Sequence, residues 1–153
     1  MSRFADDLPL LAKLAEHLLA EREGAYPRLI ADGKLTPEKA EAALRAMKAI
    51  VAQWQAIAQH RDLPPIEDYH DRFGAHPHEL RAMLDSAAAT TAKRAAADPS
   101  DRDKADYAEA VATLARLQYP WQPGFPTPRC LFLHQLNQDV RRACAAGDKR
   151  KAA

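Results

Sequence analysis

The sequence predicts an all-α protein of about five helices, and three observations lead to this fold class. Alanine is abundant, β-branched residues are few, and the commonest residues lose little conformational freedom on entering a helix. Apolar residues recur at spacings of three and four, and no segment alternates with the period of two that marks a half-buried strand. Prolines and glycines separate these periodic segments. We therefore expect an N-terminal antiparallel helical hairpin packed with a C-terminal three-helix unit.

The predicted hairpin covers residues 1–61, and its first helix is expected over 5–23. Apolar residues at spacings of three and four give this helix one apolar stripe. Gly24 and Pro27 follow the stripe. Because proline lacks an amide donor and crowds the preceding turn, we expect the helix to kink or break there.

The second helix of the hairpin has the clearest start signal in the chain. Thr36 is a good N-cap, and Pro37 fits the first helical position. An apolar seam then follows in alternating steps of four and three, formed by Ala40, Leu44, Met47, Val51, Trp54 and Ala58. The seam predicts a face buried in the hairpin, and a homodimer interface is the alternative use of the same pattern.

A connector is expected over residues 62–76, and a three-helix unit over 77–147. The apolar residues expected to pack in this unit are Leu80, Met83, Leu84, Ala87, Tyr107, Val111, Leu114, Leu117, Leu133, Leu136, Val140 and Cys144. The proline-rich loop 119–128 should lie across the helices with Trp121 and Phe125 tucked in. Residues 148–153 are predicted to form a disordered basic tail. All of these segments are expected to make one domain.

The formal charges almost cancel, at a net +1, so no global field draws the chain to nucleic acid or acidic membranes. Cys130 and Cys144 are expected on one helix, about 21 Å apart at about 1.5 Å per residue, which is too far for a disulfide. Reduced thiols and a cytoplasmic location are therefore expected. Residues 1–19 are typical of neither a signal peptide nor a membrane span, and no membrane partner is expected.

The C-terminal end is locally basic, although the whole chain is not. Cations beside aromatic rings are the ingredients of a nucleic-acid surface. The candidate residues are Arg129, Arg141, Arg142, Lys149, Arg150, Lys151 and Trp121. The alternative is a solvated helix end, whose cations suit the helix dipole, with the loop aromatics in the core.

Two short pairs of residues form the candidate zinc site. Cys130 and His134 lie one helical turn apart and face the same side, and thiolate with imidazole suits Zn²⁺. His76 and His78 would complete the ligand set if the fold brings the two pairs together. The alternative is a pair of solvated histidines and an ordinary buried thiol, with no cofactor.

Cys130 is also the candidate nucleophile of a thiol enzyme. In the first turn after Pro128, the helix dipole would lower its pKa. His134 would then act as the base, oriented by Asn137 or Asp139. The sequence identifies no oxyanion donor to accompany them.

The segment 22–36, REGAYPRLIADGKLT, resembles a pattern in uncharacterised small helical proteins of phages and prophages. Those proteins carry a charged run, Tyr-Pro, a branched apolar pair and Gly-Lys-Leu-Thr, followed by a helix with a Met-x-Ala-Ile step. Here that step is Met47, Ala49 and Ile50. The resemblance covers residues 22–57, and it implies a mobile-element origin and a helical hairpin without implying an activity.

The leading functional hypothesis is a non-enzymatic helical interaction module that binds a protein partner, with nucleic acid as a second kind of partner. The alternative is a small zinc- or thiol-dependent enzyme centred on Cys130 and His134. The two hypotheses differ in whether those residues are exposed, activated and joined by further ligands.

Overall fold

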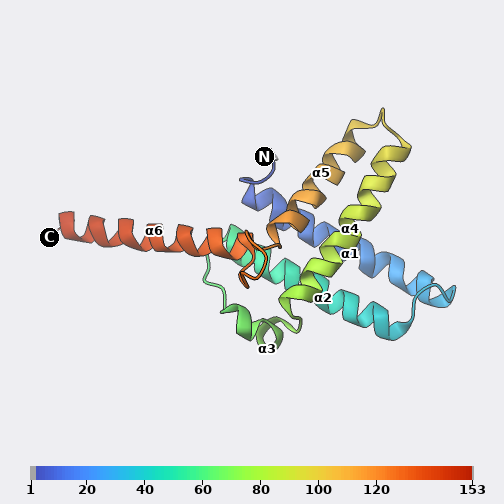
Figure 1. The fold of residues 1–153 in the computed structure, drawn as a ribbon, viewed down its shortest axis with the longest axis horizontal. Helices are drawn as coiled ribbons and strands as arrows, with labels where there is room; N and C mark the ends of the chain where they lie inside the picture. Colours follow the sequence, from blue (N-terminus) through green and yellow to red (C-terminus); the bar gives the residue numbers. More distant parts are fainter. Residues whose placement is uncertain (1–2, 153) are drawn as a thin grey trace.

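The computed structural model describes residues 3–152, and within them the chain forms six α-helices and no strand (Figure 1). The helices are α1 (Leu8–Ala31), α2 (Pro37–Ala58), α3 (Tyr69–Phe73), α4 (Pro77–Ala97), α5 (Arg102–Leu117) and α6 (Arg129–Ala152). A single 3-10 turn, Ile66–Asp68, precedes α3. The all-α fold class is confirmed, and the helix beyond the predicted five is the short α3 inside the connector.

Helices α1 and α2 form the expected antiparallel hairpin, with local caps at its ends. The Asp7 carboxylate accepts the amide of Leu10 at 3.1 Å, and the Thr36 hydroxyl accepts the amide of Lys39 at 3.2 Å. Gly33 adopts φ +69° in the turn between them, a conformation that a side chain would strain. These caps satisfy amide groups that the first helical turns leave free.

Of the kink or break expected in the first helix, the break is wrong, because α1 continues through Gly24 and Pro27 to Ala31. Proline removes one intrahelical hydrogen bond, which an amide at position 27 would have made to the carbonyl of Glu23. Both Glu23 and Pro27 are exposed, so water reaches the freed carbonyl group. The cost of the proline is therefore too small here to end the helix.

One apolar cluster joins the hairpin to the rest of the body. α1 packs mainly on α2, α4 packs mainly on α5, and contacts of α2 with α4 and of α1 with α5 join the two pairs. The seam on α2 is confirmed, since Met47, Val51 and Trp54 are buried. Leu84 of α4 and Leu114 of α5 are fully buried in the same cluster.

A buried polar network ties α3 and the end of α5 to α2. The Gln53 side-chain amide donates to the side-chain oxygen of Gln118 at 2.8 Å, and the Tyr69 hydroxyl donates to the side-chain oxygen of Gln53 at 3.0 Å. All three side chains are almost fully buried, and burial raises the pKa of Tyr69 far above its ordinary value. Because each of these polar groups has a partner, the network positions the connector and the end of α5.

Helix α6 leaves the body and projects away from it (Figure 1). The expected packing of Leu133, Leu136, Val140 and Cys144 is wrong, because all four side chains are exposed. The expected burial of Trp121 and Phe125 is also wrong, since they are 50% and 47% exposed. Helix α6 follows a long loop and runs past the core instead of across it.

The predicted tail differs as well, since α6 runs through Gly147 to Ala152 and its last turn carries Lys149, Arg150 and Lys151. Cations suit the negative end of the helix dipole, which favours this continuation. Gly147 does not take the left-handed conformation that would end a helix. The last residue of the predicted tail, Ala153, lies outside the described residues.

Candidate functional site

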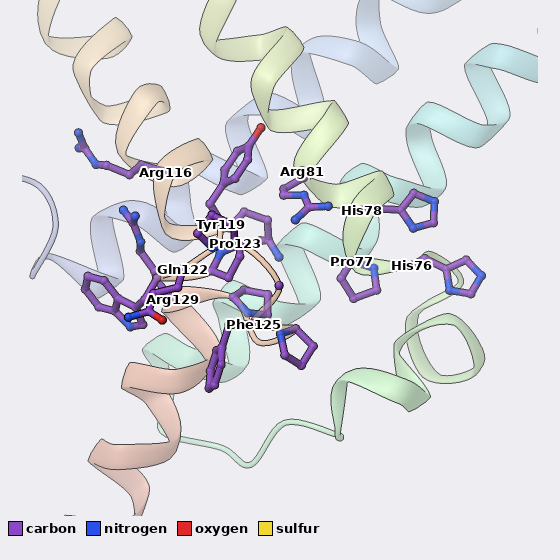
Figure 2. A pocket seen from close by; sticks show the side chains of 16 residues that line it. His76, Pro77, His78, Arg81, Arg116, Tyr119, Gln122, Pro123, Phe125 and Arg129 are labelled. Carbon is purple, nitrogen blue, oxygen red and sulfur yellow. The ribbon is translucent and has the colours of Figure 1, made fainter.

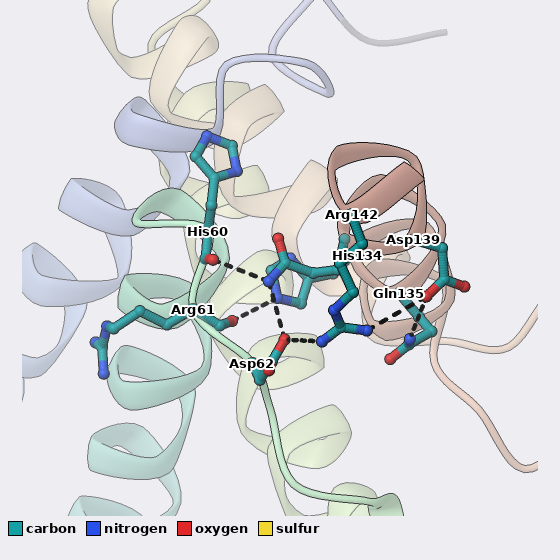
Figure 3. A network of polar contacts seen from close by, with 8 residues as sticks. His60, Arg61, Asp62, His134, Gln135, Asp139 and Arg142 are labelled. Atoms are coloured by element: carbon teal, nitrogen blue, oxygen red, sulfur yellow. Dashed lines mark hydrogen bonds and ion pairs between the residues drawn. The ribbon is translucent and has the colours of Figure 1, made fainter. Parts of the chain in front are cut away.

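The end of α2 and one face of α6 meet in the polar network shown in Figure 3. The Gln138 side-chain amide donates to the carbonyl oxygen of His60 and to Asp62 Oδ1, each at 2.9 Å. His134 Nε2 donates to the carbonyl oxygen of Arg61 at 2.7 Å. Arg142 Nη2 donates to Asp62 Oδ1 at 2.8 Å. Side chains of α6 therefore satisfy carbonyl groups of the turn that follows α2.

The turn that offers these carbonyl groups has an unusual backbone. His60 adopts φ +56°, in the left-handed region that a non-glycine residue seldom enters. The Arg61 amide then donates back to the Ala56 carbonyl oxygen at 2.9 Å, which closes the helix end. The reversed turn brings the carbonyl groups of His60 and Arg61 to α6 (Figure 3).

The anchoring row of α6 consists of Cys130, His134, Gln138 and Arg142, spaced four residues apart along one side of the helix. Asp62 accepts hydrogen bonds from two residues of this row, Gln138 and Arg142. The hydrogen bond from Gln138 and the guanidinium of Arg142 lower the pKa of Asp62. These contacts hold the first half of α6 against the end of α2. They also decide which side of α6 faces away from the body.

The exposed row of α6 consists of Leu133, Leu136, Val140 and Cys144, at spacings of three and four. Leu136 is 48% exposed and Val140 is 60% exposed. At about 100° per residue, this row lies roughly a third of a turn from the anchoring row. The helix therefore uses one side to dock on its own body and presents a second, apolar side to solvent.

The candidate thiol at Cys130 is not activated. The side chain is 4% exposed, and burial raises its pKa to about 12. The expected lowering of this pKa is wrong, because removing the thiolate from water outweighs the attraction of the helix dipole. His134 donates its Nε2 hydrogen to a carbonyl group, so that nitrogen is unavailable as a base or a metal ligand.

The histidine pair of the candidate zinc site lies elsewhere. The rings of His76 and His78 stack at 5.4 Å, and His70 stacks on His76 at 4.4 Å. His76 and His78 lie at the start of α4 and border the cavity beside the proline-rich loop (Figure 2). Within residues 3–152, no group of three or more His, Cys, Asp or Glu side chains could hold a metal ion. The fold does not bring His76 and His78 to Cys130 and His134.

The nucleic-acid candidates do not gather on one surface. Arg129 and Trp121 lie together, with the guanidinium 4.8 Å from the centre of the indole. Residues 149–151 lie at the far end of α6, about 30 Å away at about 1.5 Å per residue. Arg142 is engaged with Asp62 and, at 3.5 Å, with Asp139. The structure therefore separates the candidates into Arg129 with Trp121, the middle of α6 with Arg141 and Arg142, and the end of α6.

Arg129 and Trp121 belong to a larger basin that sequence reasoning missed. Arg81 of α4, Arg116 of α5 and Phe125 join Arg129 and Trp121 around a cavity of about 920 Å³ beside the loop (Figure 2). Arg81, Arg116 and Arg129 lie on three different helices, and no local sequence motif relates them. The nearest signal was the combination of aromatic residues and prolines in the loop itself.

No helix in the described part of the chain is long and apolar enough to cross a membrane. Among known proteins, no family model, no curated protein and no solved structure gives a significant match to this chain.

Proposed function

We propose that this chain is a non-enzymatic helical interaction module that binds a protein partner through the exposed row of α6. The observation that carries the proposal is an apolar row facing solvent on a helix that is anchored by its other side. A groove in a partner recognises a helix through apolar residues at such spacings, and these are the spacings of Leu133, Leu136 and Val140.

The charges on α6 favour an acidic partner. From residue 141 onwards, the only acidic residue is Asp148, against the basic residues Arg141, Lys149, Arg150 and Lys151 and against Arg142, which is already paired with Asp62 and Asp139. An apolar groove rimmed by carboxylates would complement both the row and its surroundings. A second copy would not, because parallel pairing sets these cations beside their equivalents and antiparallel pairing brings no carboxylate cluster opposite them. The homodimer is therefore the less favoured partner.

The small residues near the end of α6 support the same mode of binding. Ala143 and Gly147 continue the heptad spacing of Leu133, Leu136 and Val140. Such residues let a partner backbone approach closely.

The proposal includes the phage or prophage origin that the resemblance of residues 22–57 implies. It also includes a cytoplasmic location, which the free thiols of Cys130 and Cys144 support.

Site-specific photo-crosslinking in the source cells tests the proposal. A photoreactive residue replaces Leu136 or Val140, and the matched control replaces Gln135, which is exposed on the same helix but lies off the row. We expect one second protein to be crosslinked from the two row positions and not from Gln135. Adducts between two copies of this chain, adducts with lipid, or equal labelling from all three positions would contradict the proposal.

The crosslinked protein, once purified, allows a quantitative test. Leu136→Glu and Val140→Glu should each weaken its binding at least about tenfold, because a carboxylate replaces an apolar contact beside an acidic rim. Gln135→Glu should change binding less than about twofold, and added salt should weaken binding by the wild-type chain. Equal losses from the Gln135 and Val140 variants would show that the row is not the contact.

A further inference from the structure

The basin beside the proline-rich loop is a cavity lined by arginines and by no carboxylate. Its volume of about 920 Å³ is within the range of about 300–1,000 Å³ that is typical of small-molecule sites. Three arginines line it, Arg81, Arg116 and Arg129, and no aspartate or glutamate does. Within residues 3–152, none of the three guanidinium groups has a carboxylate at ion-pair distance. The basin is therefore suited to an anion.

One carboxylate close to the basin, that of Asp85, is hydrogen-bonded to a residue of its lining. Asp85 of α4 accepts the hydroxyl hydrogen of Tyr119, and the hydrogen bond to Asp85 raises the pKa of that tyrosine. Arg81 lies over the ring of the same tyrosine, 5.3 Å from its centre. The nitrogen Nε of Arg129 is buried and has no hydrogen-bond partner among the described residues. Arg116 Nη2 donates to the Thr113 hydroxyl oxygen at 3.4 Å, and the other guanidinium hydrogens at this basin can donate to a ligand.

The basin also exposes two aromatic rings. Trp121 and Phe125 are each about half exposed, although large apolar side chains normally gain by burial. Arg129 lies over the Trp121 ring, and guanidinium groups beside flat rings offer both stacking and charge. If these rings served only to cover the core, they would be buried as the loop sequence predicts.

The loop that carries these rings is held in place. The Arg129 amide donates to the Tyr119 carbonyl oxygen at 2.9 Å, which closes the base of the loop. The Phe125 amide donates to the Gln122 carbonyl oxygen at 3.1 Å, and Gly124 supplies φ +84° to that turn. Gln118, at the start of the loop, belongs to the buried network with Gln53. A ligand would meet rings that are already positioned, so it would lose little by ordering them.

We propose that this basin binds a nucleotide unit. Its base stacks on Trp121 or Phe125, and its phosphate accepts hydrogen bonds from Arg81, Arg116 or Arg129. The unit comes either from a single strand of nucleic acid or from a free nucleotide, since both present the same base and phosphate. An acidic peptide matches the charge of the basin but has no flat base for the exposed rings.

The basin is separate from the exposed row of α6, so its ligand is an addition to the proposed protein partner. Of the basin residues named here, only Arg129 belongs to α6, and it precedes the exposed row. Substitutions at Arg81, Arg116, Trp121 and Phe125 leave the row intact, and substitutions at Leu136 and Val140 leave the basin intact. Failure of one proposal is therefore distinguishable from failure of the other.

Tryptophan fluorescence of the full chain gives a direct readout. The chain has two tryptophans, of which Trp54 is 1% exposed and Trp121 is half exposed, so a ligand in the basin should quench Trp121 alone. The probes are an oligothymidylate of about eight nucleotides and thymidine monophosphate. Inorganic polyphosphate and polyglutamate serve as polyanions without bases. We expect saturable quenching by a nucleotide probe, and no such quenching in Trp121→Phe.

Anisotropy of the labelled oligothymidylate measures the contributions of single residues. Trp121→Ala should weaken binding roughly 5- to 100-fold, the range for loss of one base-stacking ring. Arg81→Gln and Arg116→Gln should each weaken binding several-fold, and each should reduce the salt dependence by about one phosphate contact. The matched control is Arg28→Gln, whose side chain is 89% exposed on α1, and it should change binding less than about twofold. Circular dichroism checks that each variant is folded.

The comparison of probes decides the source of the ligand. Tighter binding of the oligomer than of the mononucleotide, with a salt slope above about one, identifies a single strand. Equal binding of the two identifies a free nucleotide. The proposal is overturned if the polyanions bind as tightly as the oligomer while Trp121→Ala has no effect. It is also overturned if no probe saturates near 50 mM salt, or if Arg28→Gln costs as much as Arg81→Gln.

Discussion

Helices α2 and α6 carry apolar rows of the same spacing, yet the structure buries one and exposes the other. Met47, Val51 and Trp54 of α2 are at most 9% exposed, whereas Leu136 and Val140 of α6 are about half exposed or more. Both rows follow steps of three and four. The difference shows that periodicity determines which side of a helix is apolar, but not what covers that side.

The connections explain the different outcomes. A short turn joins α2 to α1, so the two helices fold back on each other and bury their rows together. The long loop 118–128 precedes α6, which then docks on the end of α2 through polar contacts. Because these contacts use the row of Cys130, His134 and Gln138, the apolar row is left exposed to solvent.

The largest expected difference concerns the two thiols of α6, one in each row. Cys144 should react with a thiol reagent at neutral pH at least about 10³-fold faster than Cys130, because Cys130 is buried and its pKa is raised to about 12. Kinetics of a disulfide reagent on the Cys144→Ser and Cys130→Ser variants measure the two rates separately. Similar rates would mean that α6 does not stay docked in solution.

The next largest difference between α2 and α6 should be in how much an alanine substitution lowers the free energy of unfolding. Ile50→Ala should lower the free energy of unfolding by about 3 kcal/mol, since Ile50 is fully buried in the cluster. Leu136→Ala should change it by less than about 0.5 kcal/mol, because solvent already surrounds that side chain. Urea unfolding followed by circular dichroism measures both. A comparable loss in Leu136→Ala would show that the exposed row is covered by self-association.

A smaller loss of free energy is expected when one side chain that anchors α6 is removed. Gln138→Ala removes two hydrogen bonds to the end of α2, a loss of about 1–2 kcal/mol. In a Cys144→Ser background, this should speed the labelling of Cys130 roughly 5- to 30-fold by allowing α6 to open. The control is Gln135→Ala, which changes an exposed glutamine of the same helix. If both variants label alike, the glutamine contacts do not hold the helix.

The smallest effect should come from acid. The pKa of Asp62 is lowered by Gln138 and Arg142, so its contribution to docking is present above the ordinary carboxyl pKa of about 4. That contribution is lost as the pH falls through the lowered value. Hydrogen exchange of α6 relative to α2, between about pH 5 and pH 2, should show α6 loosening first. If hydrogen exchange of α6 has the same pH dependence in Asp62→Asn as in the wild-type chain, Asp62 is not the group whose protonation loosens α6.

Much of the fold was predictable from residues with local physical effects. The caps at Thr36 and Gly33 and the seam of α2 act within one or two helical turns, so the sequence reveals them directly. The left-handed turn at His60 was not predictable, because the residue has no special backbone freedom and its turn is supported by α6. The meeting of Arg81, Arg116 and Arg129 also depends on how α4, α5 and α6 pack, which no local pattern fixes.

By itself, the sequence determined that this chain is helical, where most of its helices begin, and which sides of α2 and α6 are apolar. These properties follow from backbone propensity, capping and the helical period, which are local. Only the tertiary structure decided that the row of α2 is covered, that the row of α6 is open, and that Cys130 is buried. Contacts between residues that are dozens of positions apart decide burial, and burial sets both the exposure of a row and the pKa of a thiol.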